Sequence, residues 1–250
     1  MTRIILYGCN GKMGRMITDI MKDDKEAEIV AGIDKFGEPA GKYPVFKSLA
    51  DCDVPADVLI DFSSPAALSD ILENAKDRKL ALVLCSTGYS DEETMRINKA
   101  TEEFAVLRSA NMSLGVNLLL KLVNEAAKVL LAQGYDPEIV ELHHKQKLDA
   151  PSGTALAFAD AINDAVDYQY ANRYERHSVK EKRPAPEIGI SSVRGGTIPG
   201  EHEILFCGPD EVIEFRHVAY SRALFGKGAV TAAKFLAGKE PGMYSMADVI

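Results

Sequence analysis

The stretch that decides the fold is Ile4-Ile5-Leu6-Tyr7-Gly8-Cys9-Asn10-Gly11-Lys12-Met13-Gly14. Its leading apolar residues predict a buried strand, and the G-x-x-G-x-x-G spacing after them predicts a tight turn into a helix. Further apolar runs of strand length follow, with helical segments between them, at residues 28–34, 58–62, 80–85 and 104–107. Continuously apolar strands separated by helices are typical of a parallel sheet covered on both faces, so the first half is predicted to be doubly wound α/β.

The pattern changes after residue 110. A long helix is predicted over 114–131 and a second over about 153–166, with strand-like runs at 139–142, 188–193, 203–207 and 211–218. Strands joined by turn signals predict an α+β domain with a mixed or antiparallel sheet. A last helix over 223–236 is expected to pack on the first domain. The prediction is a Rossmann-like domain formed by 1–112 and 217–250, interrupted by a second domain over 113–216.

Composition excludes several classes of protein. The 250 residues carry 29 Lys and Arg against 37 Asp and Glu, a formal net charge of −8, which argues against a nucleic-acid binder or a polybasic membrane-surface protein. The four cysteines are scattered and form no C-x-x-C pair, so neither a zinc site nor a disulfide framework is expected. No signal peptide or apolar run of spanning length is visible, and a cytoplasmic protein is expected.

The glycine-rich turn also predicts chemistry. Glycines at Gly8, Gly11 and Gly14 let the backbone approach a pyrophosphate at a helix N-terminus. Asp34 ends the next strand, where an acidic side chain can accept the ribose hydroxyls of a dinucleotide. Lys12 and Lys35 lie where a 2′-phosphate would bind, so NADPH is compatible as well as NADH. The alternative is an ordinary strand-to-helix turn with solvated charges beside it.

Two more strand ends carry polar residues. Phe62-Ser63-Ser64 follows the strand over 58–61, and Ser86-Thr87-Gly88 follows the strand over 81–85. Ligands of open α/β sheets bind at the carboxyl ends of strands, so these segments fit the path of a ribose and a nicotinamide. Alternatively, each is a polar loop that only starts a helix.

A cationic segment, His143-His144-Lys145-Gln146-Lys147, follows the strand over 139–142. Just beyond it, Ser152-Gly153-Thr154 opens a helix. Cations facing a helix N-terminus make an anion site that suits a carboxylate-bearing substrate. His or Lys can also donate a proton near neutral pH. The alternatives are a zinc site, which no ligand pattern supports, a simple helix cap at Ser152, and solvated surface charge.

These motifs together carry a family resemblance along nearly the whole chain. They are Gly8-x-x-Gly11-x-Met13-Gly14-Arg15, Asp61-Phe62-Ser63, Ser86-Thr87-Gly88, Ala110-Asn111-Met112-Ser113-Leu114-Gly115-Val116-Asn117, His143-His144-x-x-Lys147-x-Asp149-Ala150-Pro151-Ser152-Gly153-Thr154, Val193-Arg194-Gly195 and Gly200-Glu201-His202. The chain resembles the 4-hydroxy-tetrahydrodipicolinate (dihydrodipicolinate) reductases of bacterial lysine and diaminopimelate biosynthesis. The His-His-x-x-Lys string is the most specific of these motifs.

The resemblance implies an NAD(P)H-dependent reductase that acts on a small cyclic dicarboxylate, and a homotetramer built through the sheet of the second domain. It implies that the nicotinamide gives a hydride and that His143 and Lys147 handle the proton, while His144 with Gly153 and Thr154 holds the carboxylates. The positions that match cofactor contacts are Gly8, Cys9, Asn10, Gly11, Lys12, Met13, Asp34, Lys35, Cys85, Ser86, Thr87, Ser109, Ala110, Asn111 and Met112.

Four positions depart from the family pattern. Cys85 stands where glycine is common, Met112 where phenylalanine is common, Lys12 where arginine is usual, and Gln146 at a position that is often basic. Two other functions stay open from the sequence. One is another two-domain nicotinamide oxidoreductase, and the other is a non-catalytic dinucleotide sensor, which would have no use for His143 and Lys147 together.

Overall fold

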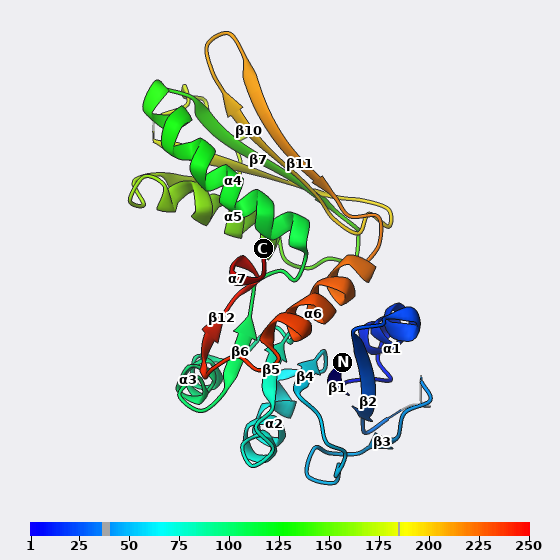
Figure 1. Cartoon of the computed structure of the whole chain (residues 1–250). Coiled ribbons are helices and arrows are strands. Elements are labelled where there is room, and N and C mark those ends of the chain that lie inside the picture. Colours follow the sequence, from blue (N-terminus) through cyan, green and yellow to red (C-terminus); the bar gives the residue numbers. More distant parts are fainter. Residues whose placement is uncertain (37–40, 185) are drawn as a thin grey trace. The chain divides into compact units, whose positions relative to one another are not determined.

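The computed structural model describes residues 1–36, 41–184 and 186–250. The chain forms two units (Figure 1). The first unit is Met1–Leu114 with Ala223–Ile250, and the second unit is Gly115–Arg222. The sequence instead predicts that the chain returns from the second unit to the first after residue 216. The chain crosses later because Val212–Val218 pairs along its whole length with the preceding strand and belongs to the sheet of the second unit.

The first unit is built on a parallel sheet in the order β12-β6-β5-β4-β1-β2-β3, with every neighbouring pair parallel. Its strands are β1 (Thr2–Tyr7), β2 (Ala27–Ile33), β3 (Val45–Phe46), β4 (Val58–Asp61), β5 (Ala81–Leu84), β6 (Ala105–Arg108) and β12 (Gly242–Tyr244). The strand order reverses between β1 and β4, which is the switch point of a doubly wound sheet. The predicted fold class is confirmed.

Helices cover both faces of this sheet. They are α1 (Lys12–Ile20), α2 (Leu68–Ala75), α3 (Asp91–Ala100), α6 (Ala223–Leu236) and α7 (Met246–Val249), with short 3-10 turns over Met21–Asp23 and Pro65–Ala67. Successive side chains of β1 enter opposite cores, because side chains alternate along a strand. Leu6 packs in a core with Ala229 of α6, and Ile5 packs in another with Ile71 of α2. The last predicted helix therefore does pack on the first domain.

The second unit carries a mixed sheet in the order β11-β10-β7-β9-β8. Its strands are β7 (Asp136–His143), β8 (Ala171–Arg173), β9 (Glu187–Arg194), β10 (Glu201–Cys207) and β11 (Val212–Val218). The β7–β9 and β8–β9 pairs are parallel, and β10 is antiparallel to both β7 and β11. Figure 1 shows α4 (Leu114–Leu130) and α5 (Gly153–Asp164) against one face, where Val123 and Phe158 join Ile139 in one core.

Strand β7 positions the chemistry of this unit. Ile139, Glu141 and His143 alternate with half-buried residues, so all three point to the face that the helices cover. The strand is thus apolar on this face at its middle and ionisable at its carboxyl end.

The short edge elements β3, β8, β12 and α7 were not predicted. They depend on pairing and capping contacts rather than on an apolar period: β12, for example, pairs with β6 from Gly242 to Tyr244. Among the described residues, no helix is long and apolar enough to cross a membrane.

Candidate active site

The glycine turn after β1 is tightly packed against the end of β4. Gly8 has φ +80°, and a Cβ at this position would lie 2.8 Å from the carbonyl oxygen of Phe62. Gly14 passes so close to the carbonyl of Gly8 that no side chain fits between them. The turn therefore needs glycine at both positions, and α1 begins directly after it at Lys12 with no side-chain cap.

A pocket of about 520 Å³ lies at this edge. Several residues predicted to contact the dinucleotide line it: Gly8, Gly11, Asp34, Lys35 and Phe62. Cys9, by contrast, is fully buried in the core beneath the turn. Lys12 is exposed on the first turn of α1.

Asp34 lies beside the glycine turn, as expected for the acid after the second strand. Its carboxylate accepts the backbone N–H of Asn10 at 2.9 Å and that of Phe36 at 3.0 Å. The amide of Asn10 in turn donates to the carbonyl of Phe36 at 2.9 Å. One carboxylate thus fixes two of the loops that border the pocket, those after β1 and β2.

Asp61 contacts the other two strand-end loops; in the sequence it belongs to a family motif but has no predicted role at the site. It has no solvent exposure, and one of its oxygens accepts Ser63 N–H at 2.9 Å and Ser63 Oγ at 2.5 Å. The hydroxyl of Tyr89 lies 3.4 Å from its other oxygen. Burial raises the pKa of Asp61, and the hydrogen bonds from Ser63 and Tyr89 oppose that rise. The loops after β4 and β5 are therefore tied to one buried carboxyl.

Of the remaining predicted cofactor positions, Met13 is half-buried on α1, and the others lie on the same unit after β5 and β6. Cys85 and Ser86 are half-buried and Thr87 is exposed, while Ser109 and Asn111 are half-buried and Ala110 is exposed. Met112 is buried, and Gly228 of α6 lies directly against its carbonyl. Burial raises the pKa of the Cys85 thiol, so this cysteine is not an activated nucleophile.

The second unit gathers three ionisable side chains at the end of β7: Glu141, His143 and Arg194. His143 Nδ1 lies 2.5 Å from Oε2 of Glu141, a carboxylate with no solvent exposure. Arg194 donates to both carboxylate oxygens of Glu141, from Nη1 to Oε2 at 2.8 Å and from Nη2 to Oε1 at 2.7 Å. The same Nη2 donates to the carbonyl of Asp149 at 2.6 Å. Arg194 therefore links β9, β7 and the cationic loop.

The pKa values of this cluster follow from these contacts. Burial would raise the pKa of Glu141, but hydrogen bonds from Arg194, Ser192 and His143 outweigh burial and lower it to about 2. Burial lowers the pKa of His143, opposed by the hydrogen bond and charge of Glu141 and assisted by the charges of Lys147 and Arg194. Glu141 is thus ionised and His143 mainly neutral at pH 7.

Ser152 caps α5 and is held from three sides. Its hydroxyl accepts Ala155 N–H at 3.1 Å and lies 3.0 Å from Nε2 of His202, and its own N–H donates to Glu141 at 3.1 Å. The side chain is buried within this network, while Gly153 beside it is exposed and Thr154 half-buried. Burial and the charge of His143 lower the pKa of His202 to about 3, so His202 is neutral.

A pocket of about 260 Å³ lies beside His144 and carries cationic groups. His144, Lys145, Gln146, Gly196, Thr197, Pro199 and Arg222 line it. The guanidinium of Arg222 lies 3.3 Å from Nε2 of His144. Lys147 pairs with Asp149 at 2.8 Å. Arg222 was missed from the sequence, because it is remote along the chain and the predicted boundary assigned it to the other domain.

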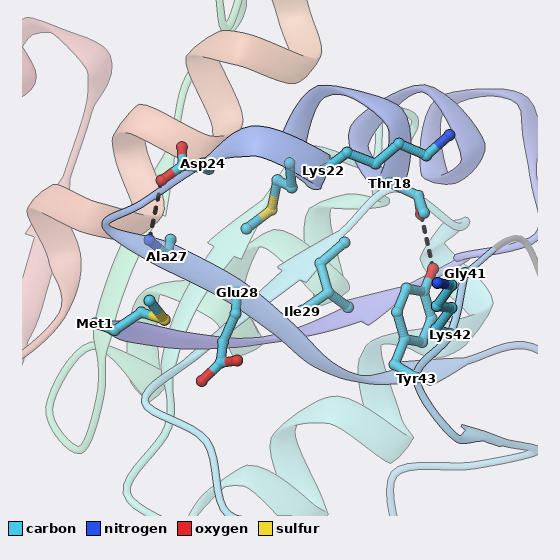
Figure 2. Close-up of a pocket in the computed structure, with 11 residues that line it drawn as sticks. Met1, Thr18, Lys22, Asp24, Ala27, Glu28, Ile29, Gly41, Lys42 and Tyr43 are labelled. Carbon is cyan, nitrogen blue, oxygen red and sulfur yellow. Dashed lines mark hydrogen bonds between the residues drawn. The ribbon is translucent and has the colours of Figure 1, made fainter.

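Another pocket, of about 720 Å³, lies in the first unit away from these groups (Figure 2). It is lined by the start of β2, including Ala27, Glu28 and Ile29, which is not the carboxyl edge where ligands of such sheets bind. Across it, the hydroxyls of Thr18 and Tyr43 are 2.7 Å apart. Within the described ranges, no cluster of three or more His, Cys, Asp or Glu side chains could hold a metal ion.

Comparison with known proteins gives one consistent result. The family model "Dihydrodipicolinate reductase, N-terminus" matches residues 2–112, and "Dihydrodipicolinate reductase, C-terminus" matches residues 115–250. The chain is 49% identical to the 4-hydroxy-tetrahydrodipicolinate reductase of Caldanaerobacter subterraneus subsp. tengcongensis, over 100% of this chain and 98% of that protein. It is 46% identical to the reductase of the same name from Clostridium novyi, with the same coverage.

A solved structure agrees with these sequence matches. The chain resembles dipicolinate-bound dihydrodipicolinate reductase from Paenisporosarcina sp. TG-14, with a TM-score of 0.82, 25% identity and full coverage of both chains. A probable dehydrogenase from Thermotoga maritima shares the fold, with a TM-score of 0.64 at 13% identity.

Proposed function

The chain belongs to the dihydrodipicolinate reductase family, and from this premise we propose that it reduces 4-hydroxy-tetrahydrodipicolinate, by way of dihydrodipicolinate, to tetrahydrodipicolinate. It is an NAD(P)H-dependent oxidoreductase of lysine and diaminopimelate biosynthesis. The observation that carries the proposal is the buried His143–Glu141 pair at the end of β7, followed directly in the chain by His144 and Lys145, which line a cationic pocket.

The first unit provides features that fit a dinucleotide. The glycine turn offers helix N–H groups to a pyrophosphate, and Asp34 borders the pocket where ribose hydroxyls would lie. Lys12 and Lys35 are exposed and available to a 2′-phosphate, which supports use of NADPH as well as NADH. When bound, the cofactor supplies a hydride to the ring of the substrate.

In the second unit, His143 and Lys147 move the proton that balances the hydride. The substrate is a dianionic ring, and the pocket beside His144 offers it cationic partners in Lys145 and Arg222. The start of α5 at Gly153 and Thr154 adds backbone N–H groups and the positive end of a helix dipole. These groups hold the two carboxylates and leave the ring beside the proton carriers.

Substitution of each proton carrier tests this assignment. With the cyclic substrate generated in situ, NADH and NADPH oxidation is followed at 340 nm for His143→Gln and Lys147→Met. Loss of a general acid is expected to lower kcat by about 10²–10⁴-fold in each. His177→Gln is the matched control, because His177 is an exposed histidine of the same unit. Near-wild-type kcat in both variants would reject the assignment. Tight NAD(P)H binding by the wild type without oxidation would instead favour a sensor.

The expected homotetramer belongs to the same proposal. One face of the second sheet is covered by α4 and α5, and the other exposes apolar side chains: Val193 is 45% and Val212 57% exposed. A second copy would bury this face, which supports assembly through the sheet. Sedimentation velocity of the wild type and of Val193→Glu tests it: a tetramer that dissociates in the variant is expected, and a wild-type monomer would contradict it. The cytoplasmic location stays a prediction.

A further inference from the structure

Glu141 is the most enclosed charged group of the second unit's site. It has no solvent exposure, and its two oxygens receive His143, both terminal nitrogens of Arg194 and the backbone N–H of Ser152. Burying a carboxylate is costly unless it is paired and hydrogen-bonded. Here the pairing with Arg194 is bidentate, so the charge is balanced in place.

The donors around Glu141 decide the protonation of His143. An ionised carboxylate is an acceptor only, and at 2.5 Å from Oε2 the nitrogen Nδ1 must carry the hydrogen of that bond. In the neutral imidazole this leaves Nε2 without a hydrogen. The nitrogen that gains and loses a proton is therefore Nε2.

The surroundings of Nε2 fit that role. A Cβ at Gly200 would lie 3.0 Å from Nε2, so the glycine keeps side-chain atoms away from it. The ring of His202 contacts the imidazole of His143 edge-on, with ring centroids 5.2 Å apart, but its own Nε2 is engaged by Ser152. Neither neighbour takes the hydrogen-bonding position at Nε2.

We propose that Glu141, locked by Arg194, is a positioning residue that fixes the Nδ1–H tautomer of His143 and so presents Nε2 for proton transfer to the substrate. This inference rests on the proposed role of His143 in the reaction. It assigns a function to a carboxylate that touches neither substrate nor cofactor.

The charges around His143 predict the direction in which its pKa moves when Glu141 is removed. Glu141 raises the pKa of His143, and Lys147, Arg194 and burial lower it. The neighbouring His202 is neutral. Removal of the carboxylate leaves only lowering influences, so the protonated acid form of His143 should exist only at lower pH.

The first test uses the wild-type protein and needs no activity. Nitrogen-15 NMR of imidazole-labelled protein distinguishes the two tautomers, and His143→Gln identifies the signals of His143 among the five histidines. We expect a protonated Nδ1 and an unprotonated Nε2 at neutral pH. An unprotonated Nδ1 in the wild type would overturn the proposal.

The second test compares Glu141→Gln with Glu138→Gln. Glu138 lies on the same strand and also bonds an arginine, Arg183, at 3.1 Å, but it points to the opposite face. We expect Glu141→Gln to lower kcat by about 10-fold or more, with KM for NADH unchanged, and to move the alkaline limb of the pH profile, where activity is lost as His143 deprotonates, to lower pH. Glu138→Gln should leave both unchanged. A wild-type kcat and pH profile in Glu141→Gln would reject positioning by this carboxylate.

Glu141→Asp is the conservative variant, since it keeps the charge near Nδ1. The alkaline limb of its pH profile should lie closer to the wild type than that of Glu141→Gln; an equal shift in both variants would contradict a role for the charge. The proposed function fails separately: wild-type kcat in His143→Gln would reject the role of His143, whatever tautomer is observed.

Discussion

Gly200 leaves space beside the imidazole of His143 because it has no side chain. A Cβ there would lie 3.0 Å from Nε2 of His143, and the backbone has φ +157°, which L residues rarely adopt. Gly200→Ala is therefore expected to displace the imidazole and to strain the backbone by about 1–3 kcal/mol. We expect kcat to fall by about 10-fold or more, with NADH binding unchanged, in a steady-state assay paired with a cofactor titration. An unaltered kcat would show that the imidazole of His143 can accommodate a methyl group at position 200.

The buried carboxylate at Glu141 predicts a dependence of stability on pH. Its pKa is lowered to about 2 in the folded protein from the usual 4.5, so its stabilising contribution is present above pH 4.5 and is lost as the pH falls toward 2. Glu141→Gln has no such titration. The difference in unfolding free energy between wild type and variant should therefore shrink as the pH falls from about 5 to 3. Urea unfolding at a series of pH values measures it, and a constant difference would contradict the contribution.

For single residues, the sequence predicts which side chains belong to the site better than it predicts which side chains contact one another. His143 and Lys147 stand out as a local cluster, which a pattern can indicate. Glu141 acquires its role only from Arg194, 53 positions away along the chain. Arg222 reaches His144 across 78 positions. No local pattern contains such pairs, because the fold of the β-sheet brings them together.

At the scale of elements, the N-cap of helix α5, Ser152, contributes both to the stability of the helix and to the proposed anion site. Ser152 caps α5, and it also contacts His202. Ser90 caps α3 of the first unit in a capping box with Glu93, and it is not among the predicted substrate contacts. Ser152→Ala and Ser90→Ala are each expected to cost about 1 kcal/mol of stability. Only Ser152→Ala should also raise KM for the substrate. Thermal unfolding and steady-state kinetics separate the two effects, and a KM increase in Ser90→Ala would show that any loss of stability perturbs binding.

The elements differ in how well the sequence predicts them. The strand β4 is a run of four buried residues, and its position was predicted because both faces demand apolar side chains. The two-residue strand β3 and the three-residue strand β12 lie at the edges of the sheet and have no apolar period. Their existence depends on backbone pairing with a neighbour, which a single sequence does not reveal.

At the scale of the whole molecule, net charge and local charge have opposite signs. The chain carries −8, yet Lys145, His144 and Arg222 surround one pocket. The substrate is a dianion in the proposed reaction, so its KM should rise with ionic strength as the attraction is screened. Arg222→Gln is expected to raise that KM by about 10-fold, because a hydrogen bond to a charged group contributes about 1.5–3 kcal/mol, and to weaken the salt dependence.

Lys128→Gln is the matched control for Arg222→Gln. Lys128 lies on α4, is half exposed and pairs with Glu125 at 2.6 Å, away from the pocket. Its KM and salt dependence should equal those of the wild type. If KM depends equally on ionic strength in the wild type, Arg222→Gln and Lys128→Gln, the pocket does not attract the substrate by charge.

The order of the two units along the chain has a mechanical consequence. Both chain ends belong to the first unit, and the second unit is inserted between Leu114 and Ala223. A pulling force applied to the two ends is therefore carried by the strands of the first sheet. The inserted unit carries no force as long as the first unit stays folded, because both of its ends are attached to that unit. In an optical trap, the first unit should rupture before the second bears any tension.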